Sequence, residues 1–171
     1  IFAELFKLIE PIDEYSILAK RQLEGWNGEM NADGVAPTIY SAFRKRFNRK
    51  LIGDQLGVLA PLAFQGSGRG APGHIGQLSS KLVEELKAGM KSNADDRLKW
   101  KQIGAETLAE AVKDLREMLG DAIDSWKWGS VHFTQPHHPL SQCFPDLSNM
   151  LDPPSIPMNG DGDTPQAASY S

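Results

Sequence analysis

Apolar residues recur every three or four positions in three stretches of the chain, which places them on one face of an α-helix. In the first stretch, over residues 12–26, they are Ile12, Tyr15, Ala19, Leu23 and Trp26. The second stretch begins near Asp33 and has Pro37 in its first turn, where proline is tolerated. Its apolar stripe consists of Ile39, Phe43, Phe47 and Leu51. The pattern therefore predicts two amphipathic helices, the second ending at Gly53 or Gly57.

The third stretch, from Ala105 to Leu119, gives the strongest helical pattern in the chain. Its apolar positions are Leu108, Val112, Leu115 and Leu119. Gly120 follows directly and is placed to end the helix. A weaker stripe, Leu82, Leu86 and Met90, predicts a further helix that Ser79 or Ser80 could cap.

The pattern changes on either side of these helices. Residues 59–77 are rich in glycine and proline and predict a mobile surface loop, without the spacing of a phosphate-binding loop. The stretch SVHFTQ (130–135) alternates and predicts a short strand, with Val131 and Phe133 on one side and His132 and Thr134 on the other. Helices followed by an extended, proline-rich segment are typical of an α+β fold. We therefore divide the chain into helical segments at 1–58 and 78–120, the loop at 59–77, and a strand- and loop-rich segment at 121–171.

Composition and charge narrow the class of protein. The chain has 171 residues, 40% of them hydrophobic, which suits a globular domain. A net charge of −4 argues against a nucleic-acid binder held by phosphate contacts. A single cysteine, Cys143, excludes a disulfide within the chain. No apolar run of about 18 residues is present to span a membrane.

Basic side chains gather on the second predicted helix, on the face opposite its apolar stripe. They are Arg44, Lys45, Arg46, Arg49 and Lys50. Such a face can bind phosphate or nucleic acid, or it can be solvated or turned toward a partner. The second interpretation supports one functional hypothesis, a non-enzymatic helical interaction domain that docks an acidic partner.

Metal binding is the first chemistry that the last third of the chain suggests. His132, His137, His138 and Cys143 could offer nitrogen and sulfur to zinc, but their spacing fits no known zinc pattern. Asn159, Asp161 and Asp163 alternate as calcium ligands do. An EF-hand loop starting at Asn159 fails, however, because its sixth and twelfth positions are Thr164 and Tyr170. We predict no metal site in this chain.

The sequence contains no motif for nucleophilic catalysis either. The chain has no G-x-S-x-G elbow, and Cys143 lies in no recognisable nucleophile signature. The residues by themselves indicate a helix-rich piece of an α+β protein without its own catalytic residues.

Three segments, taken together, resemble a known family. They are LEGWNGEMNADGVAPTIYSAF (23–43), LAEAVKDLREMLG with WKWGSVH (108–120 and 126–132), and NGDGDT (159–164). They are similar to L-x-x-W-D-G, W-x-W-G-x-x-H and G-G-D-G-D-T in the penicillin acylase (penicillin amidase) family of N-terminal-nucleophile hydrolases. The order and spacing match the later part of the family's β chain. Asn27, Asn159 and the pair Pro165–Gln166 depart from the family pattern, which puts substrate specificity in doubt.

The resemblance implies a fold and a reaction. The fold would be a four-layered αββα sandwich, of which this chain, which opens on Ile1, supplies a helix-rich part. The complete enzyme would cleave itself into α and β chains and use the first residue of the β chain as nucleophile. It would remove an acyl side chain from an amine such as a β-lactam or homoserine lactone, as in antibiotic biosynthesis. The nucleophile would then lie outside this chain.

Partners, cofactor and location are also implied by the resemblance alone. The partners would be the α chain, the remainder of the β chain and a small acyl-amide substrate. The resemblance allows a calcium ion in the complete enzyme, and it implies a periplasmic or secreted protein.

Seven residues of the matching motifs are candidates for the walls of the reaction centre. They are Trp126, Trp128, Gly129, His132, Asp161, Asp163 and Thr164. We expect the tryptophans to be buried against the central sheets and the aspartates to accept backbone N–H bonds in a tight turn. We expect His132 to point a ring nitrogen at a buried partner. Whether these residues only support the site or also orient the catalytic groups stays open.

Overall fold

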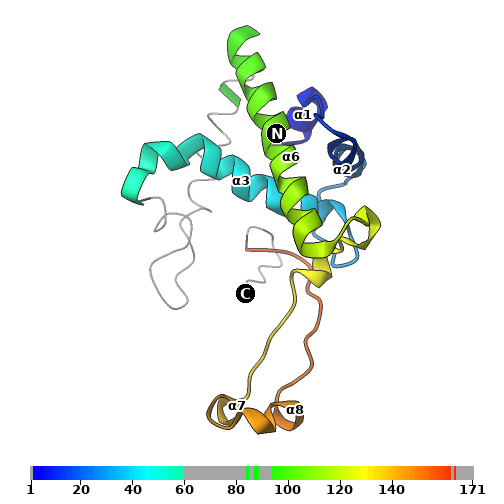
Figure 1. Cartoon of the computed structure of the whole chain (residues 1–171), viewed down its shortest axis with the longest axis vertical. Helices are drawn as coiled ribbons and strands as arrows, with labels where there is room; N and C mark the ends of the chain where they lie inside the picture. Colours follow the sequence, from blue (N-terminus) through cyan, green and yellow to red (C-terminus); the bar gives the residue numbers. More distant parts are fainter. Residues whose placement is uncertain (1, 60–83, 85–86, 89–93, 163, 165–171) are drawn as a thin grey trace.

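Four helices form the main body of the molecule, here called the helical body (Figure 1). The computed structural model describes residues 2–59, 84, 87–88, 94–162 and 164. The four helices are α1 (Phe2–Leu8), α2 (Glu14–Glu24), α3 (Ala36–Leu56) and α6 (Ala94–Leu119). Figure 1 shows α6 crossing α3, with α1 and α2 beside it.

The core of the helical body lies where α6 crosses the other helices. The predicted stripe of α3 is at its centre, since Ile39, Phe43 and Phe47 are fully buried. The rings of Phe43 and Phe47 stack with their centroids 5.1 Å apart, and Phe6 of α1 meets Phe43 edge-on at 5.0 Å. Leu108 of α6 is buried in the same core. The periodic apolar positions thus hold these helices together, as the sequence predicted.

The ends of the helices follow local chemistry. Asp13 caps α2 by accepting a hydrogen bond from the Ser16 N–H at 2.8 Å. This cap starts the helix at Glu14, so Ile12 lies outside it and is 62% exposed, contrary to our expectation of a buried position. Gly120 ends α6 with a φ of +87°, as predicted, because glycine adopts this conformation without strain.

One helix ends where predicted and another starts earlier than predicted. α3 passes through Gly53 and ends at Leu56, directly before Gly57, the second of its two predicted stops. Gly57 adopts a φ of +49° in the short helix η1 (Gly57–Leu59). α6 starts at Ala94, well before the predicted Ala105. Trp100 and Ile103, three positions apart, pack on the core and extend the apolar stripe before Ala105, so the prediction began too late. The predicted loop after Leu59 and the stripe of Leu82, Leu86 and Met90 lie outside the described residues.

The strand predicted at 130–135 is wrong. The helix η3 (Trp128–Ser130) occupies its start, and Phe133 forms an isolated antiparallel bridge with Pro157. A longer ladder does not form because two N–H groups that would extend it donate elsewhere: that of His132 to the Trp128 carbonyl at 2.8 Å, and that of Ile156 to the Thr134 hydroxyl at 2.9 Å. Pro136, Pro153 and Pro154 flank the two segments and offer no N–H of their own. The part of the chain described here is therefore helical with a single bridge, and the four-layered sandwich stays a prediction.

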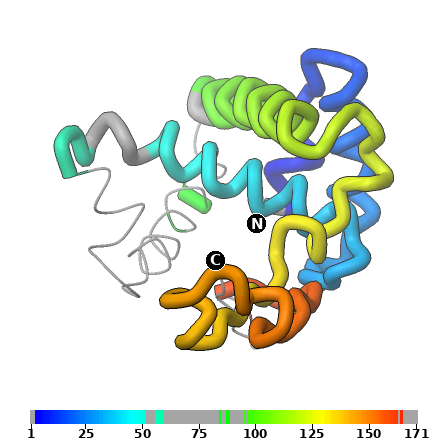
Figure 2. The backbone as a smooth tube through the Cα atoms, turned by 60° about the horizontal axis from the view of Figure 1, so that its bottom comes forward, coloured from blue at the N-terminus to red at the C-terminus, as the bar shows by residue number. Residues whose placement is uncertain are grey.

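Residues 133–157 leave the helical body as a long projection, here called the arm (Figure 1). At its end three short helices pack chiefly on one another: α7 (Pro139–Cys143), η4 (Pro145–Leu147) and α8 (Ser148–Leu151). Figure 2 shows this end, here called the tip (137–152), turned toward the viewer. Among the described helices, none is long and apolar enough to cross a membrane.

Candidate functional site

The three motif segments, far apart in sequence, meet at one place, here called the junction (30–34, 128–132, 157–162 and 164). The loop before α3 receives two hydrogen bonds from the W-x-W-G segment. The Trp128 N–H donates to the Gly34 carbonyl at 2.8 Å, and the Gly129 N–H donates to the Ala32 carbonyl at 2.7 Å. These bonds tie the start of α3 to the chain that follows α6 and η2 (Ile123–Ser125).

The G-D-G-D-T segment is bonded to both of the others. The Gly160 N–H donates to the Met30 carbonyl at 2.7 Å, and the indole N–H of Trp128 donates to the Gly160 carbonyl at 2.9 Å. The side-chain oxygen of Asn159 accepts from the Ala32 N–H at 2.7 Å. Each segment therefore holds the other two through backbone groups, which satisfies polar groups that burial would otherwise leave unpaired.

Gly129 lies where two segments of the junction approach most closely. A Cβ atom at this position would lie 2.7 Å from Cβ of Pro157 and 3.1 Å from Cβ of Ala32. It would also lie 3.2 Å from the Ala32 carbonyl oxygen. Since real Cβ contacts are longer than the first distance, only glycine fits here without a shift.

Both tryptophans of the motif are buried, as expected, but they contact different surroundings. Trp126 is fully buried in the core of the helical body, and its indole N–H donates to the Gly120 carbonyl at 2.9 Å. Trp128 is buried within the junction. The expectation that they pack on central sheets is not met in this part of the chain, where helices and loops surround them.

His132 stacks on Trp128, with ring centroids 4.7 Å apart and an angle of 24° between the planes. It is only 9% exposed, yet its Nε2 has no hydrogen-bond partner among the described residues. This corrects the expectation that the ring nitrogen points at a buried partner. An unpaired buried nitrogen costs free energy, which makes His132 an exception among the buried polar groups of the junction.

Asp161 forms an ion pair that the sequence did not predict. Its Oδ2 lies 3.1 Å from Nη2 of Arg44 on α3, and both side chains are largely buried. The backbone N–H of Asp161 donates to the Thr164 hydroxyl at 2.9 Å, and the hydroxyl donates to the Asp161 carbonyl at 3.0 Å. Asp163 lies outside the described residues. The sequence contains no local signal that Arg44 pairs with a residue 117 positions away, so the pair is found only in the folded structure.

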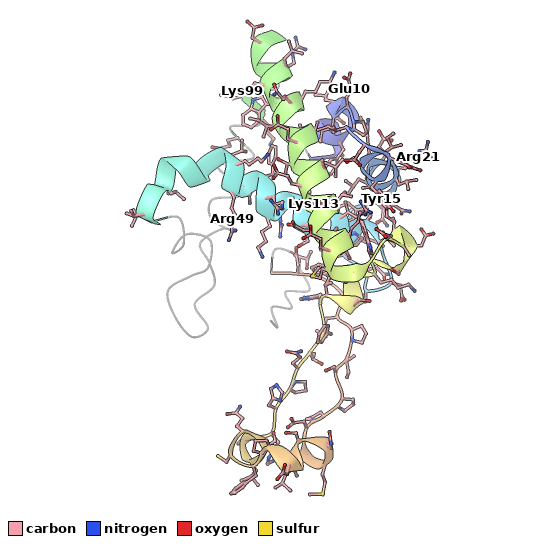
Figure 3. All side chains as sticks on the ribbon, viewed as in Figure 1. Glu10, Tyr15, Arg21, Arg49, Lys99 and Lys113 are labelled. Atoms are coloured by element: carbon pink, nitrogen blue, oxygen red, sulfur yellow. The ribbon has the colours of Figure 1, made fainter. Side chains whose placement is uncertain are left out.

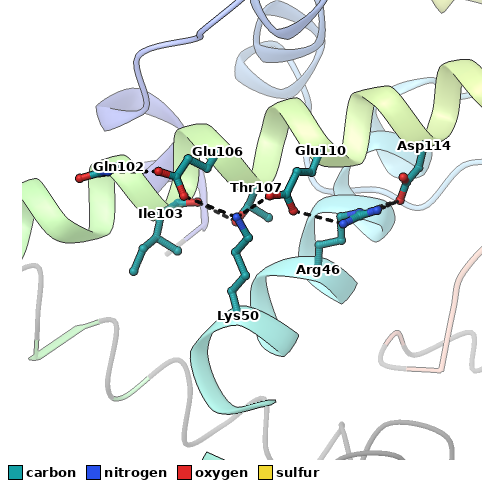
Figure 4. A network of polar contacts seen from close by, with 8 residues as sticks. All are labelled: Arg46, Lys50, Gln102, Ile103, Glu106, Thr107, Glu110 and Asp114. Atoms are coloured by element: carbon teal, nitrogen blue, oxygen red, sulfur yellow. Dashed lines mark hydrogen bonds and ion pairs between the residues drawn. The ribbon is translucent and has the colours of Figure 1, made fainter. Parts of the chain in front are cut away.

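The predicted basic face of α3 is turned partly toward α6 (Figure 4). Arg46 bonds Glu110 at 3.1 Å and Asp114 at 2.6 Å, and Lys50 lies 2.7 Å from Glu110. Three of the five basic residues, Arg44, Arg46 and Lys50, thus form ion pairs with carboxylates of the same chain. This weakens the hypothesis of an acidic docking partner, because the acidic groups are supplied internally.

A cavity of about 390 Å³ opens beside the junction. Its lining combines apolar and aromatic side chains with the Arg44–Asp161 pair, and includes Phe6, Trp26, Met30 and Tyr40. Trp26 and Tyr40 contact one another at 4.9 Å between ring centroids. The Arg44–Asp161 pair and the Thr164 hydroxyl contribute polar groups to this largely apolar and aromatic lining.

The residues considered for zinc do not converge. His137 Nδ1 lies 3.0 Å from Asp152, and His138 Nδ1 accepts from the Leu140 N–H at 3.2 Å, both at the tip and apart from His132. Cys143 is exposed. Within the described ranges, no three His, Cys, Asp or Glu residues are grouped to hold a metal ion.

Comparison with known proteins agrees with the motifs. The model of the penicillin amidase family matches residues 2–171. Penicillin acylase 2 proenzyme from Pseudomonas sp. (strain SE83) is 29% identical over 148 residues. The aligned region covers 85% of this chain but only 18% of that protein.

Proposed function

The chain belongs to the penicillin amidase family, as its motifs predicted, and from this premise we propose that the complete protein is an amide hydrolase of the penicillin acylase type. It cleaves an acyl side chain from an amine, such as a β-lactam or a homoserine lactone. The observation that carries the proposal is the family match over residues 2–171. Because the chain spans 18% of the relative's length, the reaction is assigned to the complete protein.

In this proposal the attacking group comes from the first residue of a β chain released by self-cleavage of a precursor. The free amine of that residue acts as its base, and the amide carbonyl forms an acyl-enzyme that water then hydrolyses. The relative is named a proenzyme, which supports a precursor here. The partners are then the α chain and the remainder of the β chain, and export to the periplasm or medium is part of the same proposal.

The present chain contributes a wall and not the attacking group. Gly129 and Trp128 join the segments of the junction, and Asp161 joins the junction to α3 through Arg44. Such a rigid wall supports catalysis because reacting groups must be held within a fraction of an ångström of their productive positions.

The test is hydrolysis of a panel of chromogenic acyl-amides by the complete gene product. The first residue of the mature β chain is identified by N-terminal sequencing and replaced by alanine as the matched control. We expect hydrolysis of at least one amide by the processed protein and loss of at least about 10³-fold in the control. A processed protein that hydrolyses no amide, or a control that keeps its activity, would contradict the proposal.

A further inference from the structure

We infer that the tip of the arm docks onto an apolar surface of the remaining polypeptide of the same precursor. The inference rests on the precursor in the proposed function but not on amide hydrolysis. It starts from the position of the tip, which lies away from the helical body in Figure 1.

Large apolar side chains on the arm face solvent. Leu140, Phe144, Met150 and Ile156 are each more than half exposed, with Met150 the most exposed at 74%. Three of them belong to the tip, within 11 residues of one another. Several exposed large apolar side chains on one small element are typical of protein interaction sites.

The tip has no apolar core of its own. Every residue from 133 to 157 is described, and among them only Ser141 is buried. The tip is held instead by Asp152, which accepts hydrogen bonds from the Ser141 hydroxyl and from the His138 N–H, the latter at 2.7 Å. His137 completes the cluster at 3.0 Å. The polar groups hold the tip together, and its apolar side chains face outward. These side chains can therefore be buried only against a surface outside the tip.

The composition of this region matches the centre of a protein interface. From Trp128 to Gly160 the chain carries two charged side chains, Asp146 and Asp152, and no lysine, arginine or glutamate. By contrast, α6 alone has eleven charged residues among its 26. Figure 3 shows this difference between the helical body, with Arg21, Lys99 and Lys113, and the arm. Interface centres are poor in charge and rich in aromatic residues and methionine.

The arm is also stiffened in advance. Six of the eleven prolines lie between 136 and 157. Proline fixes φ and lowers the freedom of the unbound arm, so less entropy is lost when the arm binds. At the base of the arm, the Thr134 N–H donates to the Ile156 carbonyl at 2.9 Å and the Ile156 N–H donates to the Thr134 hydroxyl at 2.9 Å.

The surface that receives the tip belongs to the rest of the same polypeptide, because most of the protein lies outside the present chain. The matched relative has more than four-fifths of its length outside the region that this chain covers. A surface on the same precursor also meets the tip at a high effective concentration, which a second copy cannot match at low protein concentration. The charge-poor tip requires that surface to be apolar as well.

Cys143 lies in the tip and provides a reporter for the test. In the complete protein we would attach a photo-activated cross-linker of short reach to its thiol and identify the linked peptides by mass spectrometry. Mixing isotopically light and heavy protein distinguishes links within one molecule from links between copies. We expect links to precursor peptides outside the present chain, within one molecule. Links confined to the helical body, links between copies, or no links would each overturn the inference.

Phe144→Asp tests the apolar contact, with Met118→Asp on α6 as a control of similar exposure. We expect Phe144→Asp to lower the yield of these links at least about five-fold and Met118→Asp to leave it unchanged. Equal yields in the two variants would reject an apolar dock. The same preparation is assayed for amide hydrolysis: links without hydrolysis reject the proposed reaction and keep the docking, and hydrolysis without links rejects the docking alone.

Discussion

At the scale of residues, Gly129 and Asp161 illustrate what a sequence can and cannot indicate. Their motifs are visible in the chain, and the burial of Trp126 and Trp128 follows from their size. The close approach at Gly129 and the partner of Asp161 depend on segments about 30 to 120 positions away. Such contacts carry no local signal, so motif resemblance identified the residues while the structure was needed for their roles.

Replacing Gly129 with alanine should destabilise the junction. The new Cβ meets the Pro157 ring and the Ala32 backbone, neither of which can swing aside as a long side chain would. We expect the free energy of unfolding of the complete protein to fall by about 1–3 kcal/mol, measured by denaturant unfolding. Gly162→Ala is the matched control, since nothing lies within 4 Å of its added Cβ. Equal effects of the two variants would contradict the close approach at Gly129.

His132 is tested by two variants of the complete protein. His132→Ala removes the ring that stacks on Trp128 and should cost about 1–3 kcal/mol of stability, with a parallel loss of turnover. His132→Phe keeps a ring and removes the unpaired Nε2, so we expect the melting temperature and the turnover to recover together. A His132→Phe protein that melts normally but turns over slowly would show instead that Nε2 orients a catalytic group.

At the scale of elements, the helices were predictable and the strand was not. Ile39, Phe43 and Phe47 follow one another at intervals of about one helical turn and are buried. This spacing predicts a helix without knowledge of the rest of the fold. The stretch at 130–135 alternates as a strand does, but a strand needs a neighbour that can bond to it. Here the His132 N–H donates to the Trp128 carbonyl and the Ile156 N–H to the Thr134 hydroxyl, so the bridge between Phe133 and Pro157 is not extended.

The fold of the tip depends on an ionised Asp152. Its pKa is lowered from 3.8 to about 2, first by the hydrogen bond from Ser141, then by those from His137 and the His138 N–H. Because the pKa is lower in the folded tip than in an unfolded chain, this stabilisation is present above about pH 4 and is lost as the pH falls through about 2.

This titration can be followed through the ¹³C shift of the Asp152 carboxyl group in the 171-residue chain. We expect a midpoint near 2, and Ser141→Ala should raise it toward 3.8 because the largest cause is removed. A midpoint that stays near 3.8 in the unmodified chain would show that the hydrogen bonds of the tip are not formed.

At the scale of the whole molecule, the chain has two parts with different sources of stability. The helical body buries large apolar side chains and carries ion pairs between α3 and α6, whereas the tip relies on polar bonds. The average charge and hydrophobicity of the chain are ordinary and do not reveal this division, although the low charge and the prolines of residues 128–160 set that region apart. The difference in stabilisation is seen when exposed Phe144 is compared with buried Phe43.

Hydrogen exchange should separate the two parts. In the 171-residue chain we expect the amides of α6 to exchange at least about 100-fold more slowly than those of α7 and α8, since local opening of the tip exposes little apolar surface. In the complete protein the amides of α7 and α8 should become markedly slower, because docking must be undone first. Mass spectrometry of peptides from both samples provides the comparison, and unchanged exchange of the tip in the complete protein would contradict its docking.

The bonds from Trp128 and Gly129 back to Gly34 and Ala32 have a consequence for how such a protein can vary. The chain that enters α3 and the chain that returns from α6 are held side by side, so residues 35–127 form an insert with adjacent ends. The faces of α3 and α6 that pack on Phe6 of α1 or pair with Asp161 are constrained by residues outside the insert. Changes in length or sequence elsewhere in the insert need not displace the neighbouring chain, so evolution or a protein engineer has freedom there.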